Sequence, residues 1–253
     1  MSTKSYAAIL TASALAFGAT SAATAGPVQT IDFDDLTHGQ VVDNEYSAQG
    51  VTISAINLGG GPNLAVAFDS SILGATEDPD LQFDGGWTGG NIADEALGRL
   101  LIIQENDAGV ADGVADRPDD EAGQPAGVIS FTFDKSIDSL GFDLIDFQNV
   151  EANDSSVTLF GNGGPFTINF TDFSNPGQFN VAGFERGDRT ANRVPMIDFA
   201  SLGLTGVDRV DFNFGGSFAV DNIAYTMVPT PSAAGAGILG LFAMLGGRRR
   251  RSA

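Results

Sequence analysis

The chain has 253 residues, of which 32 are acidic and 12 are basic, and its net charge is −20. This charge disfavours binding to nucleic acids and to anionic membrane surfaces, because their phosphates would be repelled. The absence of cysteine excludes disulfides, thiolate nucleophiles and cysteine-ligated zinc.

Residues 1–25 have the composition of a secretory signal peptide. Lys4 supplies the positive charge, residues 7–17 are apolar, and Ala-Thr-Ala at residues 23–25 matches a cleavage site. We expect a signal helix here that signal peptidase removes, so that the mature chain begins at Gly26. The protein is therefore predicted to be exported.

Residues 26–227 are predicted to form one domain of antiparallel strands. Apolar residues alternate with polar ones in several segments, which places alternate side chains on one face of a strand. The clearest such faces are Val51 and Ile53; Ile129, Phe131 and Phe133; Leu140, Phe142 and Leu144; Val157 and Leu159; Phe166, Ile168 and Phe170; and Val210, Phe212 and Phe214. Residues 134–136 are expected to form a turn. The pattern favours an all-β fold, an antiparallel β-sandwich of the jelly-roll type.

Acidic residues occupy the first and last predicted strands of this domain. In the first strand, Phe33 should point inward, and Asp32 and Asp34 should lie on the opposite face. In the last strand, Asp221 shares a face with Ile223. An unpaired carboxylate is costly to bury. Asp221 therefore either lies at a strand end in solvent or contacts a bound cation.

Two further groups of acidic residues lie between these strands. Asp-Pro-Asp at residues 78–80 predicts a tight turn with two carboxylates near each other. Residues 105–121 are rich in Asp and Glu, but they lack the ligand spacing and the distal Glu of an EF-hand loop. We interpret this segment as a solvated loop, with a second Ca²⁺ site as the alternative.

Few residues are suited to catalysis. His38 is the only histidine, and no Gly-x-Ser-x-Gly motif is present. Pairs of carboxylates suit glycoside hydrolysis, but any acidic protein offers such pairs. We therefore expect a protein without enzymatic activity.

Trp87 is the only tryptophan, and glycines flank it on both sides in residues 85–90. Such a ring either stacks on a sugar or caps the core of the domain. Trp87 is thus a candidate ligand-binding residue with a structural alternative.

The last 26 residues, 228–253, have three parts. Val228, Pro229, Thr230 and Pro231 precede an uncharged segment at residues 232–247, and the chain then carries Arg248, Arg249, Arg250 and Arg251. The uncharged segment is short for a membrane-spanning helix, which takes about 20 residues. Arginines stay on the cytoplasmic side of a membrane. We interpret this tail as a processed sorting signal with a transient apolar helix in the inner membrane; a permanent anchor or a disordered basic tail is the alternative.

The tail resembles the PEP-CTERM sorting domain of Gram-negative-type bacteria. In that family an exosortase, a membrane protease-transpeptidase, reads a Pro-x-Pro motif, an apolar helix and an arginine cluster. Pro229, Pro231 and the arginines match this pattern, and Thr230 replaces the usual glutamate. The resemblance implies delivery to the cell envelope, the cell surface or the extracellular matrix.

The body of the chain resembles the jelly-roll domains that precede such tails, and it is similar to calcium-stabilised carbohydrate-binding modules. The similarity lies in Ile-x-Phe-Asp at residues 31–34, Gly-Val-Thr at residues 50–52 and Asp-Asn-Ile-x-Tyr at residues 221–225. It implies one Ca²⁺ between the first and last strands. Asp34 and Asp221 would be its acidic ligands, and Gly50 would supply a backbone carbonyl.

The sequence thus predicts an exported, non-catalytic protein of the cell surface or matrix. Exopolysaccharide is an expected partner, and glycan binding is a sub-case of this function. A secreted glycan-active hydrolase is the alternative.

Overall fold

The computed structural model describes residues 26–74, 78–148 and 154–228, which all belong to one compact unit. The expected signal peptide (residues 1–25) and residues 229–253 of the expected sorting tail lie outside this description. Within the described part of the chain, no helix is long and apolar enough to span a membrane.

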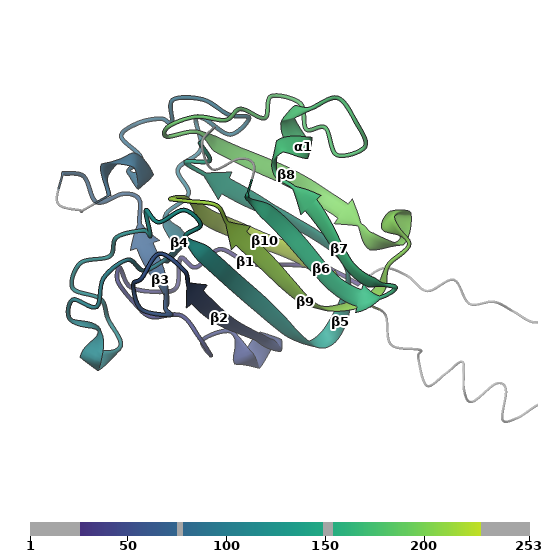
Figure 1. The fold of residues 1–253 in the computed structure, drawn as a ribbon, viewed down its shortest axis with the longest axis horizontal. Helices are drawn as coiled ribbons and strands as arrows, with labels where there is room; N and C mark the ends of the chain where they lie inside the picture. Colours follow the sequence, from purple (N-terminus) through teal and green to yellow (C-terminus); the bar gives the residue numbers. More distant parts are fainter. Residues whose placement is uncertain (1–25, 75–77, 149–153, 229–253) are drawn as a thin grey trace, which may run out of the picture. The chain divides into compact units, whose positions relative to one another are not determined.

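The described residues form ten strands and five short helical segments (Figure 1). The strands are β1 (Val28–Ile31), β2 (Val51–Asn57), β3 (Ala65–Asp69), β4 (Arg99–Ile103), β5 (Gly127–Ile145), β6 (Ser156–Asn162), β7 (Gly164–Asn169), β8 (Ala191–Asp198), β9 (Thr205–Phe214) and β10 (Ala219–Met227). The helical segments are η1 (Ser47–Gln49), η2 (Pro79–Leu81), η3 (Val110–Asp112), α1 (Thr171–Ser174) and η4 (Phe199–Leu202). The predicted all-β class is confirmed.

Hydrogen bonds join the ten strands into one antiparallel sheet. Seven strands follow the order β3-β4-β10-β5-β9-β6-β7, and β1, β2 and β8 attach to β10 or β5. The strand β5 pairs with β2, β8, β9 and β10, and the strand β10 pairs with β1, β4 and β5. Because these pairings form one continuous sheet, the jelly-roll sandwich stays a prediction.

The strand β5 continues through residues 134–136, so the predicted turn there is wrong. Its first half pairs with β2 and β9, and its second half pairs with β8 and β10. The register with β9 shifts between Thr132 and Ile137. The β5 residues of the main core have odd numbers up to Ile137 and even numbers from Leu140 to Leu144. The polar residues 134–136 lie at the shift, where they interrupt the alternation although the backbone stays extended.

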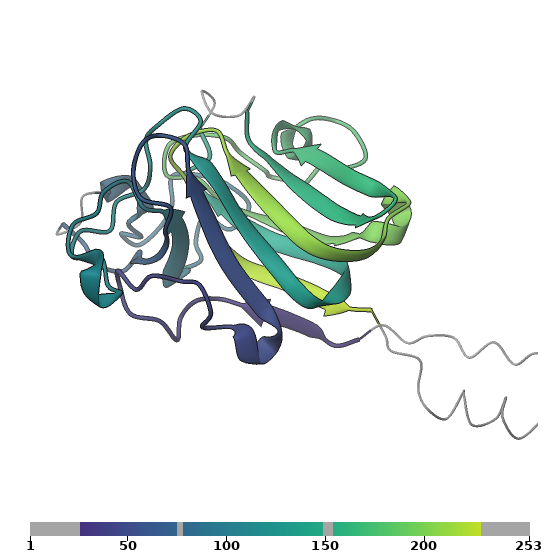
Figure 2. The same cartoon turned by 60° about the horizontal axis from the view of Figure 1, so that its bottom comes forward.

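The main core combines side chains from both halves of β5 and from the strands that pair with each half. Phe142 contacts Phe212 of β9 with ring centroids 4.9 Å apart, and Phe133 contacts Tyr225 of β10 at 5.0 Å. Figure 2 shows β2, β5 and β9 side by side, with β1 and β10 behind them. The predicted apolar faces are buried, with Phe166 partly so. Each edge-to-face ring pair adds about 0.5–1.5 kcal/mol to the stability that area burial provides.

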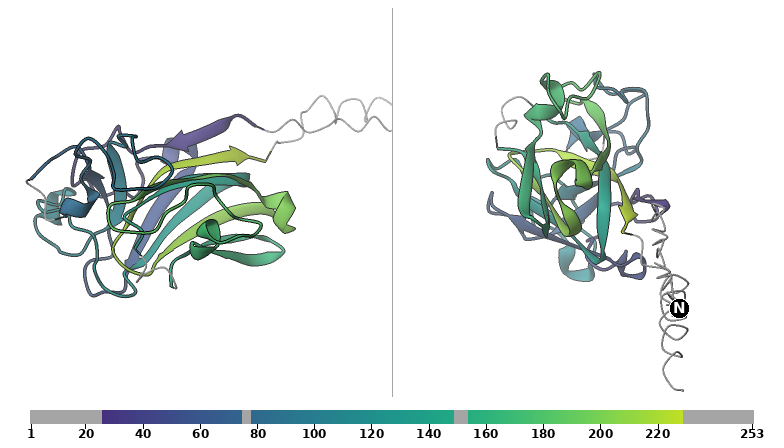
Figure 3. Two further views of the ribbon diagram at one scale, coloured as in Figure 1. Left: turned by 90° about the horizontal axis from the view of Figure 1, so that it is seen from above. Right: turned by 90° about the vertical axis from the view of Figure 1, so that its right-hand side faces the viewer.

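A second apolar cluster covers the opposite face of β4 and its neighbours. Leu101 and Ile103 belong to the main core, whereas Leu100 and Ile102 belong to this second cluster, so β4 is buried on both faces. The long loops after β3 and β4 gather at the end of the domain that carries these strands (Figure 3). We call the face of the sheet that is turned away from the main core the outer face. Residues 85–98, in the loop between β3 and β4, lie over this outer face, where the candidate site is found.

Candidate functional site

Three charged residues form one row across the outer face of the sheet. Asp221 of β10 is directly opposite Asp143 of β5, and Asp143 is directly opposite Arg193 of β8. Directly opposite side chains have Cβ atoms about 4.5–5.5 Å apart. The neighbouring row on the same face is Ala219, Ile145 and Ala191, which all belong to the second apolar cluster. The charged row therefore faces the loops that cover this cluster.

A bulge at Asn222 separates Asp221 from the apolar residues that follow it. The register with β5 shifts between Asp221 and Ala224, and Asn222 has a left-handed backbone with φ of 48°. Asparagine adopts this conformation more readily than most residues. Ile223 joins the main core, whereas Asp221 lies in the charged row on the outer face. The prediction that Asp221 and Ile223 share a face is wrong for this reason.

Arg193 neutralises Asp143 through two hydrogen bonds. Its Nε donates to Oδ1 at 2.9 Å, and its Nη2 donates to Oδ2 at 2.8 Å. Its Nη1 also forms an ion pair with Glu95 at 2.9 Å. The Asp143 side chain is 0% exposed and that of Arg193 is 43% exposed. A bidentate pair of this kind is strong and has a fixed geometry.

Asp221 is also fully buried, but its partners are weaker. Asn222 Nδ2 donates to Asp221 Oδ2 and to Asp143 Oδ2, each at 2.9 Å. Among the residues that the structure describes, Asp221 Oδ1 has no hydrogen-bond partner. Burial raises the pKa of Asp221 well above its usual value, and the negative charges of Asp143, Asp34 and Asp32 raise this pKa further. Such a carboxylate either keeps a proton or requires a cation.

Asp32 and Asp34 approach this region from the turn that follows β1. Phe33 between them is buried and has φ of 56°, which is unusual for a bulky residue. Asp32 Oδ1 accepts from the Asp34 amide at 3.3 Å, and Asp34 Oδ1 accepts from the Arg99 amide at 2.9 Å. A Cβ atom at Gly98 would lie 2.1 Å from Asp34 Oδ1. Glycine at position 98 therefore lets the Asp34 carboxylate lie against the start of β4.

Gly50 is not part of this site, and its prediction as a ligand is wrong. Its carbonyl accepts a hydrogen bond from the amide of Asp134 at 2.8 Å. The next residue, Val51, pairs with Phe133 of β5, whereas Asp221 pairs with Asp143. These two positions are separated by ten residues of one extended strand, at about 3.3 Å per residue. The sequence similarity at residues 50–52 thus marks the start of β2 and not a metal ligand.

Asp221 is a candidate ligand for a hard divalent cation. Ca²⁺ takes six to eight oxygen ligands from carboxylates, carbonyls and waters. Asp221 Oδ1 is a buried oxygen without a partner among the described residues, and the exposed Asp32 and Asp34 contribute negative charge beside it. Arg193 is engaged by Asp143 and Glu95. Among the described residues, the three carboxylates whose oxygens converge within 4.8 Å are Asp78, Asp119 and Asp120, and not Asp221, Asp34 and Asp32. A Ca²⁺ site at Asp221 and Asp34 therefore stays a prediction.

Sequence reasoning missed Asp143, Arg193 and Asn222. Asp143 lies between Phe142 and Leu144, where the alternation suggests an ordinary solvent-facing position. Its side chain is buried with Arg193 and Asn222 as partners, and no local pattern predicts these contacts. The Asp-Asn sequence at residues 221 and 222 does carry a signal, because asparagine in a strand favours a left-handed bulge.

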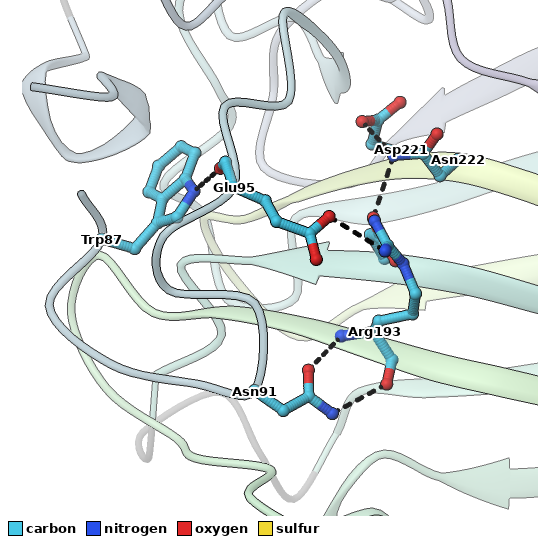
Figure 4. Close-up of polar contacts among 7 residues, drawn as sticks. Trp87, Asn91, Glu95, Arg193, Asp221 and Asn222 are labelled. Atoms are coloured by element: carbon cyan, nitrogen blue, oxygen red, sulfur yellow. Dashed lines mark hydrogen bonds and ion pairs between the residues drawn. The ribbon is translucent and has the colours of Figure 1, made fainter. Parts of the chain in front are cut away.

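Trp87 caps the second apolar cluster. It is 6% exposed, its ring packs against Phe83, and its Nε1 donates to the Glu95 carbonyl at 2.9 Å (Figure 4). A buried ring leaves no face for a sugar. The interpretation of Trp87 as a ligand-binding residue is therefore wrong, and the structural alternative describes its place.

His38 has a structural contact as well. Its Nδ1 accepts a hydrogen bond from the Asp69 amide at 2.9 Å, and its ring packs edge-on against Phe68. Burial lowers the pKa of His38, so the imidazole is neutral and accepts at neutral pH. This contact joins the turn at residues 37–40 to the end of β3.

A second acidic cluster contains residues from the Asp-Pro-Asp segment at residues 78–80 and from the acidic segment at residues 105–121, which are separate in the sequence. Carboxylate oxygens of Asp78, Asp119 and Asp120 lie within 4.8 Å of one another. Ser217 donates to Asp120 Oδ2 at 2.7 Å. Burial raises the pKa of Asp120 well above its usual value, and the neighbouring Asp78 raises it further. The interpretation of residues 105–121 as a solvated loop is thus wrong at Asp120, which is buried.

Asp146, which directly follows β5, should make stability depend on pH. Burial raises the pKa of Asp146 to about 8, and the charges of Asp80 and Asp188 add to this effect. The folded protein then holds a proton that the unfolded chain, with a carboxyl pKa near 3.9, releases. This contribution to stability is full below about pH 4 and is lost as the pH rises through about 8.

We expect the Asp146→Asn variant to lose less stability than the wild type between pH 5 and pH 9. Asparagine tolerates the left-handed φ of 62° and can still accept from the Arg189 amide. Urea unfolding at both pH values measures the difference. Equal pH dependence of the two proteins would show that Asp146 is ionised in the folded state.

The predicted sorting residues are described only at Val228. Val228 is exposed, and its amide donates to the Ser136 carbonyl at 2.9 Å. The other residues of the predicted motif, Pro229, Thr230, Pro231, Arg248, Arg249, Arg250 and Arg251, lie outside the described residues.

Comparisons with known proteins assign no family. No family model and no curated protein matches the chain. Among solved structures, the chain is similar to the K2 cleaved adhesin domain of Lys-gingipain, with 12% identity and a TM-score of 0.36. The match covers 79% of this chain and 100% of that domain. A likeness of this strength carries no argument about function.

Proposed function

We propose that the protein is an exported, non-catalytic protein of the cell surface or extracellular matrix, and that a bound Ca²⁺ stabilises its β domain. One observation carries the calcium assignment. Asp221 is fully buried with its Oδ1 unpartnered among the described residues, while Asp32 and Asp34 lie at the end of the adjoining strand β1. A cation there would convert a costly buried charge into a link between the first and last strands.

The sorting part of the proposal rests on the sequence. Residues 1–25 support export through signal peptidase, and residues 228–253 support recognition by an exosortase-type protease-transpeptidase. Exopolysaccharide of the matrix is the proposed partner at the destination. Within this proposal the two sets of strands joined by β5 face each other as a jelly-roll-like sandwich, which the ring contacts of Phe142 with Phe212 support.

The proposal that the protein is not an enzyme is supported by the contact of His38. Its Nδ1 accepts a hydrogen bond from the Asp69 backbone amide, which gives the imidazole a structural role. A secreted glycan-active hydrolase stays the alternative. Release of reducing ends from a neutral polysaccharide by the purified protein would favour this alternative, and intact polysaccharide after prolonged incubation would disfavour it.

Thermal unfolding in Ca²⁺ and in EDTA tests the calcium assignment. A ligand at about 100 times its Kd stabilises the folded state by about 2.7 kcal/mol. For a domain of this size we expect a rise in Tm of roughly 5–11 °C with Ca²⁺. Mg²⁺ at the same concentration is the control and should have a smaller effect, because it requires near-ideal octahedral geometry. An identical Tm in Ca²⁺ and in EDTA would contradict the assignment.

A further inference from the structure

A groove of about 350 Å³ lies next to the charged row on the outer face of the sheet. Its floor is a row of small side chains across three strands, in which Thr30 of β1 pairs with Ala224 of β10 and Ala224 pairs with Gly141 of β5. Pro195 and Met196 of β8 also line the groove, and Met196 is 38% exposed. The volume falls within the range of about 300–1,000 Å³ that is typical of small-molecule sites.

The polar end of the groove presents hydrogen-bond donors in a fixed arrangement. Arg193, Asp143 and Asn222 line this end. A guanidinium has five N–H donors, of which Arg193 uses three on Asp143 and Glu95. The Asp143 carboxylate is 0% exposed and accepts from Arg193 and Asn222, so it orients the guanidinium and does not itself contact a ligand. Because Arg193 is held by two acidic partners, its exposed edge stays in place without a ligand.

The charges around the groove exclude a charged occupant. Arg193 is opposed by Asp143 and Glu95, so this end of the groove carries a net negative charge and attracts no anion. The whole chain, with a charge of −20, repels anions as well. A cationic ligand would meet the exposed guanidinium first. A neutral ligand whose oxygen atoms accept hydrogen bonds from Arg193 fits best, and hydroxyl groups accept such bonds.

We propose that this groove binds a neutral sugar unit of a glycan, with Arg193 donating hydrogen bonds to its hydroxyls and Met196 packing on the ring. The inference deepens the proposed function, since it names the site and the ligand class for glycan binding. The groove borders the candidate cation site through Asn222, which bonds both Asp143 and Asp221.

Isothermal titration calorimetry of the full chain with neutral hexasaccharides of glucose and of mannose tests the groove, with a uronic acid hexamer as the charged probe. We expect a neutral hexasaccharide to bind. Ala224→Leu, which fills the floor, should weaken this binding by about tenfold or more, and Met196→Ala at the exposed wall should weaken it severalfold. Thr167→Leu places the same side chain on the exposed face of β7 and should leave binding unchanged.

Three results would overturn the proposal: no binding of any neutral hexasaccharide, tighter binding of the uronic acid hexamer, or wild-type affinity in a folded Ala224→Leu variant. The titrations are run in Ca²⁺ and in EDTA. Sugar binding that persists while Ca²⁺ leaves Tm unchanged would contradict the calcium assignment alone. A calcium-dependent Tm without sugar binding would contradict the groove alone.

Discussion

Replacing Arg193 by methionine is expected to lower the free energy of unfolding by about 3 kcal/mol. Breaking a buried ion pair by removing one partner costs about 3–5 kcal/mol, because the other charge stays buried without compensation. The Asp143 side chain is 0% exposed, and Asn222 would be its remaining partner from this network. Water reaches Arg193, which is 43% exposed, so we expect the lower end of this range. Urea unfolding, with an unchanged m-value, measures the loss.

Arg209→Met is the matched control for this variant. Arg209 is 46% exposed and forms an ion pair with Asp211 at 3.2 Å, but Asp211 retains 16% exposure. Removal of an arginine from such a pair should cost about 1 kcal/mol or less. The double variant Arg193→Met with Asp143→Asn should recover much of the loss, because position 143 then carries no uncompensated charge. Equal costs for Arg193→Met and Arg209→Met would contradict the described burial of Asp143.

Asp221→Asn is expected to change stability in opposite directions with and without calcium. In EDTA the variant should be more stable than the wild type, because an amide replaces a carboxylate that is buried with one oxygen unpartnered among the described residues. In Ca²⁺ the variant should lose the calcium-dependent gain, about 2.7 kcal/mol at 100 times the Kd. Chemical unfolding of both proteins in both conditions measures this crossing.

Asp134→Asn separates the two possible locations of the cation. Asp134 is exposed and contacts Gly50, which the structure places away from Asp221. This variant should respond to Ca²⁺ as the wild type does. If Asp134→Asn abolished the response and Asp221→Asn preserved it, the cation would belong to the start of β2, as the sequence similarity at Gly50 suggests.

The strand faces could be predicted from the sequence because they depend on local alternation. Ile129, Phe131 and Phe133 are buried as expected, and so are Val210 and Phe212. Alternation fails where a bulge intervenes. At residues 134–136 the polar interruption reflects a change of register and not a turn, and at Asn222 a left-handed residue moves Asp221 to the other face.

The candidate site was predicted only in part because its contacts join distant segments. Asp221 and Asp34 carry a visible signal, since both flank apolar residues in predicted strands. Their neighbours depend on strand order, which places β10 between β1, β4 and β5. The loop of residues 85–98 then brings Glu95 to Arg193, which also pairs with the buried Asp143. Trp87 was ambiguous for the same reason, because burial of a ring is decided by what covers it.

A crystal structure of the full chain grown with CaCl₂ tests the central claim, that a cation binds at Asp221. We predict an anomalous peak bonded to Asp221 Oδ1 and to a carboxylate oxygen of Asp34, at the Ca²⁺–oxygen distances of about 2.3–2.6 Å. The absence of a peak at Asp221, or a peak only between Asp78 and Asp120, would contradict the claim.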